Sequence, residues 1–200
     1  MGRRSDHSRE ELEALILAEA HRLMSERGFV GFSAREVAKR IGYSVGTIYN
    51  VWTSLDRLLA AINSRTFTLW ADALSARLAA AGDDRIAALV QGYFAFAREH
   101  NNLWAAIYEH RLPEGMHLTK EDMAQRSALT DIVVDEIARF LGYEDPERAR
   151  PLARSLIATV HGHCALELTG AFSLLEEPDP EGQALARVRE ALEASGAQTL

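Results

Sequence analysis

A short stretch of the sequence carries side chains suited to contacting DNA, but its composition suits a protein core poorly. Residues 44–52 read Ser-Val-Gly-Thr-Ile-Tyr-Asn-Val-Trp, and the glycine and the β-branched residues lower the helix propensity. Gly46 permits close approach of a backbone, and Asn50 can pair with a base edge. Thr47 and Tyr49 can donate hydroxyl groups to phosphates. The stretch is therefore typical of a recognition helix.

A second group of side chains has the types that bind metal ions, but its spacing argues against such a site. Its members are His161, His163, Cys164 and Glu167. His163 and Glu167 form a pair four residues apart on a helix, whereas His161 pairs with Cys164. The two pairs face different directions, because positions 161 and 163 lie about 200° apart around a helix. We expect no metal and no cofactor.

The sequence contains no motif of an enzyme. It lacks a nucleophile elbow, a phosphate-binding glycine loop and a constellation of paired carboxylates. We therefore expect a protein that is not an enzyme. The alternative is a helical-bundle enzyme or a small-molecule carrier that does not bind DNA.

Composition and charge indicate a soluble globular protein with an uneven charge distribution. Of 200 residues, 48% are hydrophobic and 26% are charged, and the net charge is −7. Residues 1–58 carry nine basic and eight acidic groups, so the acidic excess lies in the remainder. No apolar run approaches the roughly 18 residues that span a bilayer, and the N-terminus does not resemble a signal peptide. We expect a cytoplasmic protein with no membrane partner.

The spacing of apolar residues predicts an all-α protein with nine helices. Capping boxes mark the starts of three helices, at residues 8–11, 33–36 and 119–122, and Asp-Pro pairs mark two more, at 145–146 and 179–180. The expected helices are 8–27, 33–41, 45–51, 54–81, 85–100, 102–110, 119–141, 146–170 and 180–194.

The first three helices have the lengths and the turn of a helix-turn-helix unit. Only Gly42 and Tyr43 separate the second helix from Ser44, which can cap the third. Ile48 can anchor the third helix inward. We predict a helix-turn-helix DNA-binding domain at 1–56 and a helical-bundle domain for ligand binding and dimerisation at 57–200.

Residues 12–59 resemble the DNA-binding head of TetR-type regulators almost position by position. The similarity is carried by 16–20 (Ile-Leu-Ala-Glu-Ala), 27–29 (Arg-Gly-Phe), 33–38 (Ser-Ala-Arg-Glu-Val-Ala), 41–49 (Ile-Gly-Tyr-Ser-Val-Gly-Thr-Ile-Tyr) and 58–59 (Leu-Leu). The resemblance implies phosphate contacts from three side chains, Ser33, Thr47 and Tyr49, and base-edge contacts from three others, Arg35, Ser44 and Asn50. Gly46 and Trp52 complete the predicted DNA-binding set.

Two positions depart from the pattern of the family. Trp52 stands where the family usually has Phe, and Leu55 stands where it usually has Lys at the start of the fourth helix. The second departure removes a cation that would meet the DNA backbone.

Two stretches of the second domain resemble the Trp-His-Gly type of TetR body. They are 103–110 (Leu-Trp-Ala-Ala-Ile-Tyr-Glu-His) and 160–162 (Val-His-Gly), followed by Gly170. This implies a ligand cavity between the middle helices, and aromatic or polarizable side chains suit an organic ligand. Our candidates are Tyr93, Phe96, Trp104, Tyr108, Met123 and His161, each of which could instead be a packing residue.

The last two helices have apolar seams that could form a homodimer interface. The candidates are Leu156, Val160, Leu168, Leu185, Val188 and Leu192, although these could be buried within one subunit. A two-fold operator requires a dimer. The resemblance thus implies a homodimeric regulator of transcription, a repressor released from a double-stranded DNA operator by a small apolar or aromatic effector.

Overall fold

The computed structural model describes residues 7–197, and these form helices and turns with no strand. The all-α fold class predicted from the sequence is therefore confirmed. Contacts divide the chain into two compact units. The first contains residues up to 67 together with 100–125, and the second contains 68–99 together with the residues from 126 onward. Each unit is described separately below.

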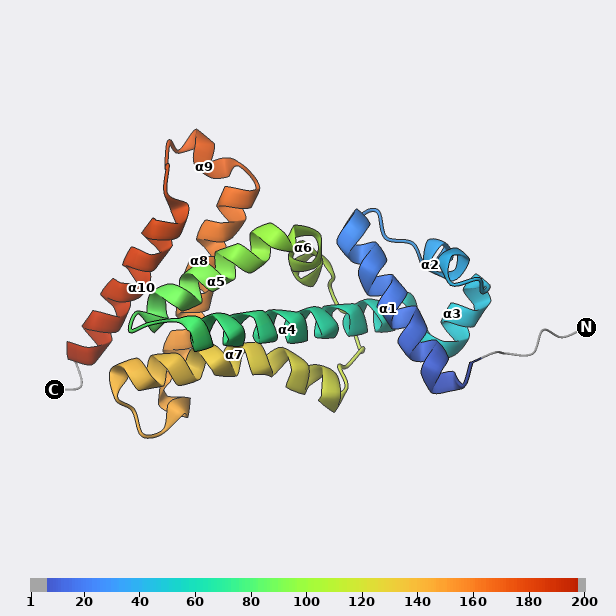
Figure 1. Ribbon diagram of the computed structural model, residues 1–200, viewed down its shortest axis with the longest axis horizontal. Helices are drawn as coiled ribbons and strands as arrows, with labels where there is room; N and C mark the ends of the chain where they lie inside the picture. Colours follow the sequence, from blue (N-terminus) through green and yellow to red (C-terminus); the bar gives the residue numbers. More distant parts are fainter. Residues whose placement is uncertain (1–6, 198–200) are drawn as a thin grey trace, which may run out of the picture. The chain divides into compact units, whose positions relative to one another are not determined.

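The first unit contains four complete helices and parts of two others (Figure 1). These are α1 (Arg9–Arg27), α2 (Ala34–Arg40), α3 (Val45–Trp52), the first half of α4 (Leu55–Ala80), α6 (Asn101–Glu109) and the start of α7 (Lys120–Leu141). Its core joins buried side chains of α1, α2 and α3 to those of α4. Ile16, Val37 and Ile48 are at most 1% exposed, as their helical spacing predicts.

Helix α6 completes the core of this unit. Leu103 and Ala106 belong to the same buried cluster as the apolar residues of α1 and α3. The Asn102 side-chain amide donates to the Ser25 carbonyl at 2.7 Å, and His110 lies 3.2 Å from the Asp56 carboxylate. A segment about fifty residues downstream of α3 is therefore part of the fold that surrounds α1–α3, which we call the head.

The second unit is built from the remaining helices. It contains the end of α4, α5 (Arg85–Glu99), most of α7, a 3-10 turn (Pro146–Ala149), α8 (Arg150–Leu168), α9 (Ala171–Leu174) and α10 (Pro180–Ala197). Helices α8 and α10 lie side by side, and both pack against α5. Their apolar stripes meet in a core that includes Phe94, Ile137 and Leu192.

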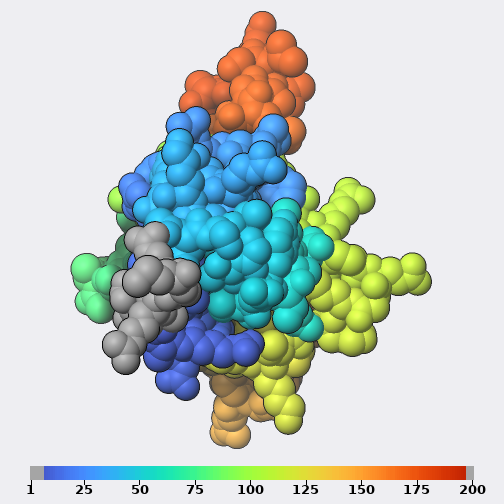
Figure 2. Space-filling model, turned by 90° about the vertical axis from the view of Figure 1, so that its right-hand side faces the viewer, coloured from blue at the N-terminus to red at the C-terminus, as the bar shows by residue number. Residues whose placement is uncertain are grey.

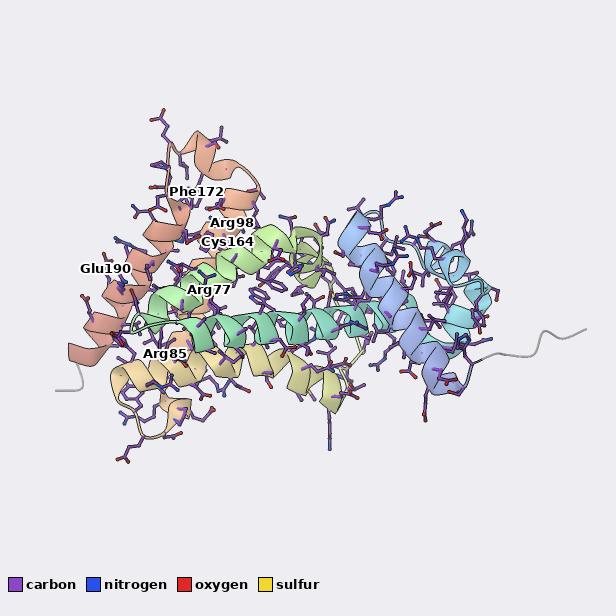
Figure 3. The ribbon with its side chains drawn as sticks, viewed as in Figure 1. Arg77, Arg85, Arg98, Cys164, Phe172 and Glu190 are labelled. Carbon is purple, nitrogen blue, oxygen red and sulfur yellow. The ribbon has the colours of Figure 1, made fainter. Side chains whose placement is uncertain are left out.

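Two networks of arginine and glutamate tie the helices of the second unit together. Arg85 at the start of α5 makes two hydrogen bonds of 2.7 Å to the buried Glu136 of α7. Arg98 at the end of α5 pairs with Glu167 of α8 and Glu181 of α10, each at 2.7 Å. Both arginines are marked in Figure 3. These contacts fix the two ends of α5 against three other helices.

The predicted capping signals form in most cases. The Ser8 hydroxyl accepts from the Glu11 N–H at 3.1 Å, and the Glu11 carboxylate accepts from the Ser8 N–H at 2.7 Å. Thr119 and Asp122 exchange the same pair of bonds. At α2 the box is half formed, because the Glu36 carboxylate binds Arg40.

The structure departs from the expected helices after residue 145. The expected single helix begins with the 3-10 turn, and α8 starts at Arg150. Pro151 has no N–H to continue an α-helix from residue 147, so it sits in the first turn of α8. Gly170, with φ of 74°, ends α8, and the four-residue α9 that follows was not predicted. Within residues 7–197 no helix is long and apolar enough to span a bilayer.

Candidate DNA-binding and ligand-binding sites

One buried side chain packs helix α3 against α1 and α2, and an N-terminal cap stabilises the start of the helix. Ile48 is 1% exposed and packs in the core of the first unit. The Ser44 hydroxyl accepts from the Thr47 N–H at 3.2 Å and lies 3.0 Å from the Thr47 hydroxyl. These contacts compensate for the poor helix propensity of the stretch and hold two hydroxyl groups together at the helix start.

The remaining side chains of α3 mostly face outward. Tyr49 is 43% exposed, and Ser44, Gly46 and Asn50 are also exposed. Helices α2 and α3 form adjoining parts of one surface, coloured light blue and cyan in Figure 2. Ser33 is exposed at the start of α2, and its oxygen accepts from the Glu36 N–H, so its hydroxyl hydrogen can still be donated. The surface thus presents hydroxyl, amide and phenol groups together.

The fold itself gives no reason for a glycine at position 46. A Cβ added to Gly46 would meet only the Ser44 hydroxyl oxygen, at an ordinary contact distance of 3.6 Å. Gly46 is helical and lacks the positive φ that favours glycine elsewhere in the chain. No contact among the described residues therefore requires a glycine at this position.

Two cations on α2 remain available to an external anion. Arg35 and Lys39 are exposed, one helical turn apart, and neither forms an ion pair within residues 7–197. By contrast, Arg40 contacts Glu19, Glu26 and Glu36, and these carboxylates raise the pKa of its guanidinium. Arg22 is likewise paired with Glu19 and Glu26. Lys39 was not among our predicted residues, although its position four residues after Arg35 is a signal for it.

Trp52 differs from the other residues of the predicted DNA-binding set. It is half-buried against the core of the first unit, and its indole N–H is enclosed with no hydrogen-bond partner among the described residues. In this structure Trp52 acts as a packing residue. Leu55 is 36% exposed, and Arg57 is half-buried with one enclosed guanidinium nitrogen.

The second unit contains a narrow apolar cavity of about 40 Å³. Side chains of α5, α7, α8 and α10 line it, and all but one are aliphatic: Ile86, Leu89, Val90, Tyr93, Val133, Ile137, Leu156, Ile157, Val160 and Val188. Among our six candidate ligand-binding residues, only Tyr93 lines this cavity. The other lining residues depend on how four helices pack, which helical spacing alone does not specify.

Two further candidates lie close to Tyr93. The Tyr93 hydroxyl is 2.9 Å from Nδ1 of His161, and burial lowers the pKa of this imidazole. Phe96 is buried and stacks on Trp70, with ring centroids 4.7 Å apart and an interplanar angle of 3°. The Trp70 ring also meets the Tyr93 ring edge-on at 4.7 Å. Sequence reasoning did not identify Trp70, because nothing in its local pattern separates it from a core residue.

The other three candidates belong to the first unit. Trp104 is buried, and its ring lies 5.2 Å from that of Tyr108. Tyr108 and Met123 are about half exposed. The six candidates are thus divided between the two units.

Most of the candidate dimer residues are buried within the chain. Leu156, Val160, Val188 and Leu192 are at most 6% exposed, and the first three of them line the cavity. Leu168 and Leu185 are half-buried. Of the six candidates, only Leu168 and Leu185 are thus accessible enough to contact a partner subunit directly.

The cysteine and histidine side chains of α8 do not form a metal site in the described part of the chain. Within residues 7–197 no group of three His, Cys, Asp or Glu side chains is placed to hold a metal ion. Cys164 is buried beside Arg98 (Figure 3), and burial raises the pKa of its thiol to about 12. His163 bonds to the Thr159 carbonyl of its own helix.

Two family models match the chain. Residues 16–62 match the model of bacterial regulatory proteins of the tetR family, and residues 86–192 match the model of the tetracyclin repressor-like C-terminal domain.

Curated and solved relatives are similar over most of the chain. The HTH-type transcriptional activator FasR of Mycolicibacterium smegmatis is 26% identical over 152 residues, which cover 75% of this chain and 69% of that protein. A protein of unknown function from Rhodococcus sp. RHA1 has a TM-score of 0.69 at 22% identity, with 96% and 98% of the chains covered. The multidrug binding protein EbrR in complex with proflavin has a TM-score of 0.61 at 20% identity, with 92% and 99% covered.

The C-terminal model alone covers more than half of the sequence, and the N-terminal model spans the helix-turn-helix. The chain belongs to the TetR family of bacterial regulatory proteins.

Proposed function

We propose that this protein is a homodimeric regulator that inserts the two copies of α3 into successive major grooves of an operator. The observation that carries the proposal is the outer surface of α2 and α3. It combines exposed hydroxyl, phenol and amide groups, a glycine that the fold does not require, and two unpaired cations. Phosphate contacts would come from Ser33, Thr47 and Tyr49, and base contacts from Arg35, Ser44 and Asn50.

The second half of the proposal is that a small apolar molecule bound in the second unit lowers the affinity for the operator. The solved relative EbrR is described as a multidrug binding protein and is complexed with proflavin. A ligand that favours the non-binding conformation by a few kcal/mol would lower operator affinity by orders of magnitude. The resemblance of 103–110 and 160–162 to the Trp-His-Gly type of body, from which we expect a cavity between the middle helices, supports this part of the proposal.

Release by a ligand corresponds to repression when the operator overlaps a promoter, which is the direction that we propose. The curated relative FasR is described as an activator, so activation is the alternative to the repression that we propose. A regulator of transcription acts where the bacterial chromosome lies, and we therefore place the protein in the cytoplasm.

The proposal is tested by operator binding with two matched substitutions on α3. The purified protein should bind a palindromic site in its own upstream region, located by footprinting, in preference to scrambled DNA. Tyr49→Phe should weaken binding to all sites by a similar factor, because it removes a phosphate contact. Asn50→Ala should in addition relax the preference at particular base pairs by roughly 1–3 kcal/mol.

Both side chains are exposed, so neither substitution should change the thermal midpoint of unfolding. Equal affinity of the wild-type protein for operator and scrambled DNA at moderate salt would contradict the proposal. An unchanged base preference in Asn50→Ala would contradict the base-reading role of that residue.

A further inference from the structure

The cavity of the second unit is too narrow for an aromatic ring in its present form. Its volume is about 40 Å³, whereas a cavity that binds benzene measures about 150 Å³. Nine of its ten lining side chains are the aliphatic groups of Leu, Ile and Val. A slender chain can enter such a space with small rotamer changes, because it needs only the width of one methylene group.

The lining of the cavity contains a single polar side-chain group, the hydroxyl of Tyr93. Tyr93 is the only lining residue with a polar side-chain atom, and its hydroxyl meets His161 at 2.9 Å. No charged side chain lines the cavity. Burial of an unpaired charge in such a place is costly, so the polar end of a ligand must be neutral.

A buried N–H group without a partner lies next to Tyr93. Trp70 does not itself line the cavity: it lies behind Tyr93, is 1% exposed, and its ring contacts those of Tyr93 and Phe96. Its indole nitrogen has no hydrogen-bond partner among the described residues. Such groups are rare in folded proteins, because an unsatisfied buried donor destabilises the fold. A ligand with a hydrogen-bond acceptor would supply what this donor lacks.

We infer that the effector is an uncharged aliphatic molecule whose chain enters the α5–α7–α8–α10 cavity and whose single carbonyl or hydroxyl oxygen hydrogen-bonds at Trp70 and Tyr93. The inference rests on the proposed function, in which a ligand binds the second unit. It specifies the chemistry of that ligand and identifies Trp70 as a residue that determines specificity.

Four probes separate the possible ligand chemistries, each added to the full-length protein. They are 2-octanone, octane, octanoate and proflavin, with binding followed by calorimetry and by the thermal midpoint. We expect 2-octanone to bind most tightly, octane more weakly and octanoate most weakly of the three. Tighter binding of octanoate or of proflavin than of 2-octanone would overturn the inference, as would no detectable binding of 2-octanone.

Substitutions then locate the bound probe. Val160→Phe and the milder Ile157→Phe fill the cavity and should abolish binding of 2-octanone. Leu166→Phe adds the same ring to an exposed position of the same helix and should leave binding unchanged. If Val160→Phe fails to fold, Ile157→Phe decides, because Ile157 is only half-buried. Undiminished binding in a folded cavity variant would overturn the inference.

The role of Trp70 is tested by removing its N–H while an aromatic ring is retained at this position. Trp70→Phe should weaken binding of 2-octanone by about five- to tenfold, the usual effect of one neutral hydrogen bond. The same substitution should leave the affinity for octane, which has no acceptor, nearly unchanged. Equal losses for both probes would show a packing role and overturn the assignment of this donor.

The operator assay separates this inference from the proposed function. Operator binding that proflavin weakens and 2-octanone does not affect would overturn the inference and leave the proposed function intact. Equal affinity of the unliganded wild-type protein for operator and scrambled DNA would contradict the proposed function, regardless of which probes bind.

Discussion

The fold does not require a glycine at position 46, whereas the proposed contact with DNA does. The chain accommodates a Cβ there at 3.6 Å from its nearest neighbour, and a glycine inside a helix is destabilising. A residue that lowers stability without a structural reason is expected where a partner approaches closely. Gly46 is therefore a direct probe of the surface that we propose contacts DNA.

Gly46→Ala should stabilise the protein and weaken DNA binding at the same time. We expect the free energy of unfolding to rise by about 0.5–1 kcal/mol, measured by urea denaturation. Operator affinity should fall by about tenfold or more, because the added methyl group meets the DNA backbone. Gly162→Ala is the control for the gain in stability alone: Gly162 is helical with open space at its Cβ, so this variant should show a similar gain. Unchanged operator binding in Gly46→Ala would show that DNA does not approach α3 there.

Lys39 should contribute one phosphate contact. Lys39→Gln should lower the slope of log Kd against log salt concentration by about one, since each neutralised phosphate releases close to one counterion. The reason is that Lys39 is exposed and unpaired in the described part of the chain. Arg22→Gln removes a cation that is already paired with Glu19 and Glu26, so its slope should match the wild-type slope. Equal slopes in all three proteins would exclude Lys39 from the interface.

At the scale of helices, the sequence predicted where most helices begin and end, but it did not predict which helices pack against one another. Ser8, Ser44 and Thr119 mark helix starts because a cap is a contact between residues two or three positions apart. The partner of α6 depends on which of its faces is buried, and Leu103 and Ala106 pack in the first unit. For the same reason the cavity shares only Tyr93 with our candidates, since its lining combines four helices that are far apart in sequence.

The junction of α5 and α7 depends on a carboxylate that is 6% exposed. Glu136 accepts three hydrogen bonds of 2.6–2.7 Å, two from Arg85 and one from Arg139, and these contacts lower its pKa. Glu136→Gln should lower the free energy of unfolding by roughly 1–3 kcal/mol, because it leaves the Arg85 charge uncompensated while Arg85 keeps some access to water. Chemical denaturation would measure this loss.

Glu147→Gln provides the matched control for that junction. Glu147 pairs with Arg150 at the surface, and this variant should leave the denaturation midpoint unchanged. Equal midpoints for Glu136→Gln and the wild-type protein would show that the Arg85 network is dispensable.

For the molecule as a whole, one histidine predicts how stability changes with pH. His21 of α1 lies 3.2 Å from the Thr66 hydroxyl of α4, and burial together with the nearby Arg65 and His100 lowers its pKa to about 4. The unfolded chain, in which this histidine titrates near 6.5, therefore binds the proton more readily. Stability from this group is complete above about pH 6.5 and is lost as the pH falls towards 4.

His21→Gln should remove this part of the pH dependence. The urea midpoint of the wild-type protein should fall between pH 7.5 and pH 5, and the midpoint of the variant should fall less over the same interval. Parallel curves for the two proteins would show that His21 does not account for the acid sensitivity.

The packing of α6 against the head limits how this regulator can be re-engineered. A hybrid that joins residues 1–67 to the effector domain of another regulator would replace Leu103 and Ala106, which complete the core of the head, and Asn102, which binds Ser25. The residues of the head are thus contiguous in the sequence, but its core also needs residues of α6. Hybrids that change operator choice should graft the exposed residues of α2 and α3 alone, or transfer residues 100–125 with the head.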